Sequence, residues 1–126
     1  MAFLANYRCG SGMAGAQTLT LELLVSSRLD KTGSVTVTGI GTITQAINPP
    51  LNLQTFIKGV VHMLNGPTAV AMTGTSVTGE QNFQGVLLLP NGWGKPGSAS
   101  YVYVRDGEQI DVGPVDATPI AAEKAA

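Results

Sequence analysis

Charged side chains are scarce in this sequence, at 12% of its 126 residues, against about 25% in ordinary globular proteins. Seven lysine and arginine residues against eight aspartate and glutamate residues leave a formal net charge of −1. Proteins that bind nucleic acid usually present a basic surface that neutralises backbone phosphates. We therefore expect no nucleic-acid partner.

Cysteine and histidine each occur once, as Cys9 and His62. A single cysteine forms no intrachain disulfide, and one thiol and one imidazole do not make a typical zinc site. The sequence also has no Gly-x-Ser-x-Gly segment of the kind that presents a nucleophilic serine. We expect Cys9 to pack as a small apolar residue, His62 to be an ordinary strand residue, and the protein to need neither metal nor cofactor.

Long apolar runs are missing as well. Hydrophobic residues make up 44% of the chain, yet no run approaches the roughly 18 residues that a membrane-spanning helix needs. The segment Met1–Arg8 has no basic stretch followed by a long apolar one, so it does not read as a signal peptide. We expect a cytoplasmic protein without a membrane span, with export by a signal-independent route left open.

What the sequence does contain is a series of short runs in which Val, Leu or Ile alternates with Thr or Ser. Because successive side chains of a strand point to opposite faces, this alternation predicts strands with one buried face. The Asp106-Gly107 dipeptide between two such runs is typical of a β-hairpin turn. The expected strands cover 3–8, 18–25, 34–44, 51–63, 69–74, 83–89, 101–105 and 108–112, and the expected turns include 30–33, 48–50 and 65–67.

These runs predict an all-β chain, an antiparallel meander of about eight strands joined by short connections. A meander of this kind hides its edges by closing into a barrel or by folding into two packed sheets. The pattern favours a β-sandwich or a flattened barrel and does not separate the two. The length fits one domain, which we place at residues 1–113, followed by an Ala/Pro-rich tail over 114–126.

Three segments that follow one another along the chain carry a resemblance to a known family. Gly12-Met13-Ala14-Gly15-Ala16 precedes an alternating strand, Thr44–Leu51 reads Thr-Gln-Ala-Ile-Asn-Pro-Pro-Leu, and Trp93 is followed by Pro96–Tyr103. In this the chain resembles a proteobacterial family known as domain of unknown function 1842. The resemblance implies a small bacterial β domain, and it implies no activity.

The segment Gly10-x-Gly12-x-x-Gly15 matches the glycine pattern of dinucleotide-binding folds. In those folds a helix follows the third glycine, and the pyrophosphate lies at its N-terminus. Here an alternating run begins at Thr18, which predicts a strand. We therefore interpret the segment as a glycine-rich loop.

The loop Asn91–Gly97 holds the candidate binding residues. A lone Trp between glycines can present its ring to the face of a sugar or to an apolar partner, and neighbouring polar side chains can supply hydrogen bonds. The alternative is that Trp93 folds back over the end of a small barrel. Asn91, Trp93 and Lys95 are therefore the candidate ligand-binding residues, with a carbohydrate as a possible ligand.

An enzymatic role would have to rest on carboxylates. A hydrolase of the glycosidase type needs two carboxyl groups that converge across a cleft. Asp30, Glu80, Asp106 and Asp111 fall at predicted turns or strand ends, and no spacing among them indicates such a pair. We expect a non-enzymatic module that binds a partner or self-assembles, with a small carbohydrate-binding domain or a hydrolase as the alternatives.

The low charge also bears on association between copies. Native sheets use charged side chains to discourage edge-to-edge pairing, and the main strand charges here are Glu22, Lys58 and Arg105. A net charge near zero leaves little repulsion between copies. The threonine-rich faces of Ser34–Thr44 and Thr73–Thr78 look flat enough to pack against another chain. We therefore expect a homo-oligomer, or a complex with another protein.

The first prediction concerns secondary structure. Because the alternation has a period of two residues throughout, the far-UV circular dichroism spectrum should show a single β-type minimum. A spectrum with the helical double minimum would contradict the all-β assignment and would favour the dinucleotide-binding alternative.

Overall fold

The computed structural model describes residues 2–11, 13, 15–29, 35–47, 50–63 and 67–120. Within these ranges the chain consists of strands joined by turns, and none of it forms a helix that could cross a membrane. The strands are β1 (Phe3–Cys9), β2 (Thr18–Leu29), β3 (Val35–Gln45), β4 (Leu51–Met63), β5 (Thr68–Thr75), β6 (Gln81–Leu89), β7 (Gly97–Arg105) and β8 (Glu108–Pro119).

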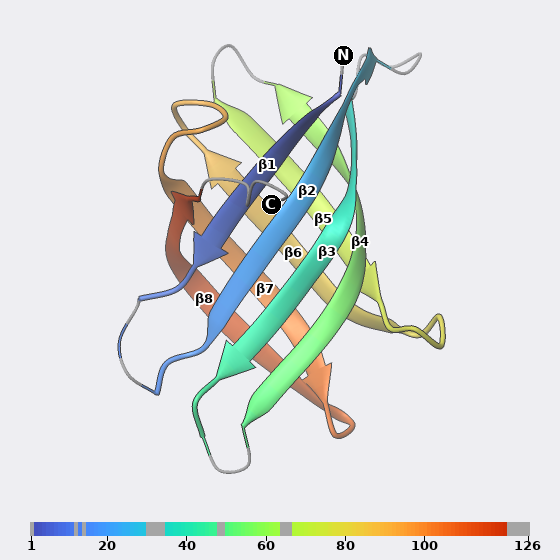
Figure 1. Ribbon diagram of the computed structural model, residues 1–126, viewed down its shortest axis with the longest axis vertical. Helices are drawn as coiled ribbons and strands as arrows, with labels where there is room; N and C mark the ends of the chain where they lie inside the picture. The colour runs from blue at the N-terminus through green and yellow to red at the C-terminus, as the bar shows by residue number, and fades with distance from the viewer. Residues whose placement is uncertain are drawn as a thin grey trace, which may run out of the picture.

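The eight strands form a closed antiparallel barrel in which each strand pairs with its neighbours in the sequence. Closure comes from β1, which pairs with β2 along its whole length and with β8 over Tyr7–Cys9 (Figure 1). The predicted all-β meander is confirmed. Of the two architectures that the pattern left open, the chain forms the barrel and not the sandwich, because the first and last strands pair with each other.

The strand bounds agree with the alternation except at the C-terminal end. β8 continues to Pro119, and Ala117 pairs with both Cys9 and Gly97. The prediction that a tail begins at residue 114 is therefore wrong for 114–119, which belong to the barrel. The proline at 114 is tolerated because the β7–β8 register shifts between Ala99 and Tyr101, next to it in the sheet. The expected turns at 30–33, 48–49 and 65–66 and the rest of the tail, 121–126, lie outside the described residues.

Alternate side chains of every strand point into the barrel and fill it. A barrel of eight strands has an interior just wide enough for side chains to occupy, and the largest of the fully buried side chains here are aromatic. Every strand contributes at least one buried apolar residue to this filling. The largest fully buried side chains are Tyr7, Tyr103, Phe83, Leu19, Leu21, Leu23, Ile43, Ile57, Leu87, Leu89, Val25 and Val37.

Three aromatic rings stack along one wall of the interior. Phe83 and Tyr101 lie with ring centroids 5.8 Å apart and planes at 28°, and Tyr103 continues the series at 6.2 Å from Tyr101 with its plane tilted by 32°. Gly85 lies beside them, with the ring of Phe83 over the place where a side chain would be. The glycine thus makes room for the ring, and the ring covers the backbone that glycine would leave bare.

Glycines at inward positions also let the sheet curl. A Cβ atom on Gly39 would overlap the carbonyl oxygen of Glu22, and one on Gly59 would overlap that of Ala71. Neighbouring strands therefore approach more closely at these points than a side chain permits. The close approach bends the sheet, which is what eight long strands need in order to close.

A matched pair of alanine substitutions tests this account. Gly39→Ala places a methyl group against backbone atoms that cannot move aside, so we expect the free energy of unfolding to fall by about 2–3 kcal/mol. Gly113→Ala should change it by no more than about 0.5 kcal/mol, because no atom lies within 4 Å of the added methyl group. Urea unfolding of the two variants measures the difference, and equal effects would contradict a steric role for Gly39.

Candidate functional site

The interior of the barrel is occupied by its own side chains. Among the interior polar groups, the Thr55 hydroxyl donates a hydrogen bond to Asn82 Oδ1 at 2.7 Å, whereas the buried Tyr103 hydroxyl has no hydrogen-bond partner among the described residues. Within the described part of the chain, no three His, Cys, Asp or Glu side chains are close enough to hold a metal ion. The recesses described below all lie on the outside of the barrel or at its seam.

Two ionisable groups inside the barrel are held in their neutral form. Cys9 is fully buried, and burial raises the pKa of its thiol to about 12. Burial likewise raises the pKa of the Tyr101 phenol to about 12, with the neighbouring Cys9 and Tyr103 adding to the effect. A buried, protonated thiol is a poor nucleophile. This agrees with the packing role expected for Cys9.

The loop between β6 and β7 is folded back against the barrel. The Trp93 ring meets Phe3 edge to face, with centroids 5.5 Å apart and planes at 79°. The next residue, Gly94, donates its backbone N–H to the Tyr7 hydroxyl at 2.9 Å. Gly92 and Gly94 have φ angles of 87° and 78°, values that favour glycine, so the tight path of the loop depends on both. Together these contacts fix the loop over one end of the barrel.

The predicted ligand residues of this loop are therefore not gathered into a site. Asn91 and Lys95 are exposed, whereas Trp93 is partly buried and packs against the core. Trp93 Nε1 is shielded from solvent and has no hydrogen-bond partner among the described residues. The arrangement corresponds to the alternative stated for Trp93, in which the ring covers the barrel end.

A groove of about 550 Å³, which we call the outer groove, lies on the outer face of β1, β2 and β3. Its lining combines apolar side chains with hydroxyl, amide and charged ones, in the mixture found where proteins meet one another. The outer groove is lined by Leu4, Asn6, Arg8, Thr20, Glu22, Leu23, Leu24, Thr38, Gly39, Ile40 and Ile120.

The curl of the sheet at Gly39 explains the position of the groove. Leu23 and Gly39 are opposite each other in the register, and the Leu23 side chain is buried in the barrel. They therefore present mainly backbone to the outside and form the floor of the groove. Leu24 on one side and Glu22 on the other project outward and form its walls.

Two opposite charges face the outer groove. Glu22 is opposite Asn6 in the β1–β2 register, and Arg8 is two residues farther along β1. Diagonal neighbours of this kind are roughly 7–8 Å apart at their backbones. Neither side chain forms an ion pair with any other residue that the structure describes. Among the described residues, the groove thus carries one cation and one anion that have no ion-pair partner.

A second recess of about 280 Å³ adjoins the first at the seam of the barrel. β8 pairs with β1 only as far as Tyr7, and the Ile120 N–H adds one bond to the Asn6 carbonyl oxygen. Beyond that point the described part of the chain offers no strand to Phe3, Leu4 and Ala5 on this side. The seam recess lies there and shares Leu4, Asn6 and Ile120 with the outer groove.

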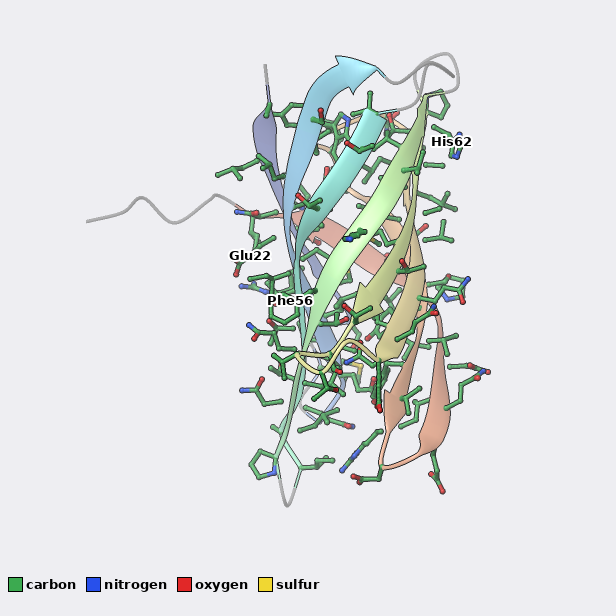
Figure 2. The ribbon with its side chains drawn as sticks, turned by 90° about the vertical axis from the view of Figure 1, so that its right-hand side faces the viewer. Glu22, Phe56 and His62 are labelled. Atoms are coloured by element: carbon green, nitrogen blue, oxygen red, sulfur yellow. The ribbon has the colours of Figure 1, made fainter. Side chains whose placement is uncertain are left out.

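The other residues singled out in the sequence lie apart from these recesses. Figure 2 shows Glu22 and Phe56 on one side of the barrel and His62 on the other, and all three are exposed. Glu80 and Asp106 are exposed in turns, and Asp106 is 3.9 Å from the guanidinium of Arg105. The outer groove contains Glu22 as its one carboxylate. It therefore does not provide the carboxyl pair that a glycosidase requires.

The sequence predictions did not include the outer groove. A signal was available, because Leu4, Leu24, Ile40 and Phe56 occupy outward positions that a strictly amphipathic strand would give to polar residues. The register was needed to show that these residues lie side by side: Leu4 pairs with Leu24, and Ile40 pairs with Phe56.

The fold and its recesses define a small all-β protein whose barrel is packed inside and carries its concave surfaces on the outside. The chain belongs to the family described as domain of unknown function DUF1842, whose model matches residues 1–109. The match runs from β1 through β7 and reaches the start of β8. The family resemblance read from the three sequence segments is thereby confirmed. A search of curated proteins found no match.

The buried thiol and phenol predict a loss of stability at alkaline pH. Both groups hold their protons more tightly in the folded chain than in the unfolded chain. The contribution of these two protons to the free energy of unfolding is therefore complete below the ordinary pKa values of the groups and is lost as pH rises toward about 12. Each group lowers the free energy of unfolding by up to about 1.4 kcal/mol per pH unit in this range. Urea unfolding should show the decline beginning near pH 9, where a free thiol ionises.

The Cys9→Ala variant is the control for this prediction. Without the thiol, the free energy of unfolding should change less between pH 9 and pH 10 than in the natural chain. An identical decline in both proteins would show that the Cys9 proton is not the source.

Proposed function

We propose that this protein is a non-catalytic binding module that recognises a polypeptide partner with the outer groove and the adjoining seam. The observation that carries the proposal is the division of the molecule into a filled interior and a recessed exterior. A barrel that holds a small ligand keeps an internal space for it, whereas here large aromatic and aliphatic side chains take up the interior.

The character of the outer groove supports a polypeptide partner. Leu4 and Leu24 are 65% and 46% exposed and lie next to each other across the β1–β2 pair. Exposed apolar side chains that cluster beside polar ones mark interaction surfaces more often than isolated ones do. The surrounding Thr20, Thr38 and Asn6 can exchange hydrogen bonds with a peptide backbone or with polar side chains.

A carbohydrate-binding role through the β6–β7 loop is the second candidate, and one observation favours it: the loop is held rigidly by the Tyr7 hydroxyl. A rigid loop lowers the entropic cost of binding. The contact of Trp93 with Phe3 weighs against this role, because it covers part of the ring that would stack on a sugar. The outer groove is therefore the better supported site.

Site-specific photo-cross-linking tests the proposed function. A photoreactive benzoylphenylalanine placed at Leu24 should give discrete higher-mass adducts in cells that naturally make the protein. The matched control is the same residue at Leu88, which lies on β6 and is 47% exposed. It should give at most diffuse background.

Three results would contradict the proposal. Adducts at position 88 and not at 24 would move the binding surface to another face. No adduct at either position would remove the evidence for a polypeptide partner. Calorimetric titration that shows sugar binding by the natural chain and not by Trp93→Ala, with no adduct at 24, would favour the carbohydrate-binding role.

A further inference from the structure

We infer that the partner of the outer groove is a second copy of this chain, held in a two-fold symmetric dimer in which Arg8 of each copy pairs with Glu22 of the other. This inference rests on the proposed function and names its partner. It goes beyond a general tendency to associate, because it assigns the contact to one face and to one pair of charges.

Charge complementarity is the first argument. A two-fold interface brings the same surface patch of each copy together, so the patch must be complementary to itself. The outer groove satisfies this condition because it contains one cation, Arg8, and one anion, Glu22. A partner of strongly acidic or basic character would leave one of these two charges facing a like charge, which opposes binding.

The two charges are also available for such a contact. Both side chains are exposed, and neither is paired with another residue in the part of the chain that the structure describes. Rotation by a half-turn brings Arg8 of one copy toward Glu22 of the other and repeats the contact at the symmetric position. One pair of residues in the sequence thus supplies two ion pairs in the dimer.

Apolar side chains surround this pair of charges. Leu4 and Leu24 lie on one side of the Asn6–Glu22 row, and Ile40 lies beside Glu22 within the row. Phe56, the partner of Ile40 in the register, extends the apolar area onto β4 (Figure 2). Covering these exposed residues removes apolar surface from water, which is the main favourable contribution to association. The net charge of −1 opposes the approach of two copies only weakly.

Sedimentation equilibrium of charge-reversal variants tests the inference. The natural chain should show a concentration-dependent mass that rises from 13.0 kDa toward twice that value. Arg8→Glu and Glu22→Arg should each weaken self-association by at least about tenfold, because each replaces two attractive contacts with two repulsive ones. Glu108→Arg makes the same change of charge as Glu22→Arg on an exposed residue at the start of β8 that does not line the outer groove, and it should leave association unchanged.

The decisive measurement is a mixture of the two weakened variants. Arg8→Glu carries two acidic residues at the contact and Glu22→Arg carries two basic ones, so an equimolar mixture should recover the dimer mass. Only pairing between copies predicts this recovery, since each chain in the mixture still has like charges on its own surface. The recovery also shows that both variants are folded.

Two other outcomes would overturn the inferred dimer, and neither would by itself overturn the proposed function. A mass of 13.0 kDa over a hundredfold range of concentration would show that no dimer forms. A dimer that Arg8→Glu and Glu22→Arg leave intact would place the contact on another face. In either case an adduct at position 24 with a different polypeptide would still support the binding module, whereas the absence of any adduct would end both proposals.

Discussion

Backbone pairing between the first and the last strand is the constraint on which the rest of this structure depends. Every strand needs a neighbour on both sides, because unpaired backbone groups at a sheet edge attract other chains. β1 and β8 satisfy this need for each other over Tyr7–Cys9. That contact requires a sheet curled enough to bring its ends together, and the inward glycines at 39 and 59 allow the curl. Closure then encloses the apolar faces of all eight strands at once.

Closure of the barrel also determines which surfaces remain available for binding. The enclosed volume is small, and the side chains that stabilise the barrel fill it. The concave surfaces that remain arise where the sheet bends or where its pairing stops. The outer groove has the bend at Gly39 as its floor, and the seam recess lies where β8 no longer accompanies β1. The outer groove and the seam recess therefore result from the bend at Gly39 and from the short β1–β8 pairing, which are also the two features that close the barrel.

The sequence predicted the strands well because alternation is a local signal. Thr18–Leu23 alternates without interruption, and the apolar residues expected on its buried face, Leu19, Leu21 and Leu23, are all buried. The extension of β8 to Pro119 was missed because Gly113 and Pro114 resemble a break, and only the pairing with β7 and β1 shows that the strand resumes. The choice between barrel and sandwich was out of reach for the same reason, since a pairing between residues 7–9 and 117–119 leaves no local mark.

The candidate site was harder to predict than the fold. Trp93 was correctly recognised as unusual, but its contact with Phe3 joins residues that are far apart in the sequence. The outer groove depends on which residues of β1, β2 and β3 lie opposite one another in the sheet. A shift of the register by one residue would turn each outward leucine inward. A groove of this kind has no motif. Its residues become neighbours only through the register.

The wide separation of β1 and β8 in the sequence has a consequence for how the chain folds. Hairpins between consecutive strands close short loops, whereas the β1–β8 contact closes a loop of nearly the whole chain. The entropic cost of closing that long loop is the largest of all. The barrel should therefore close last, after the meander has formed as an open sheet. Contacts of such range slow folding, and until closure the sheet exposes the edges of both β1 and β8. Two chains that meet at this stage could exchange their end strands, so dilute conditions and slow removal of denaturant should favour refolding to the closed form.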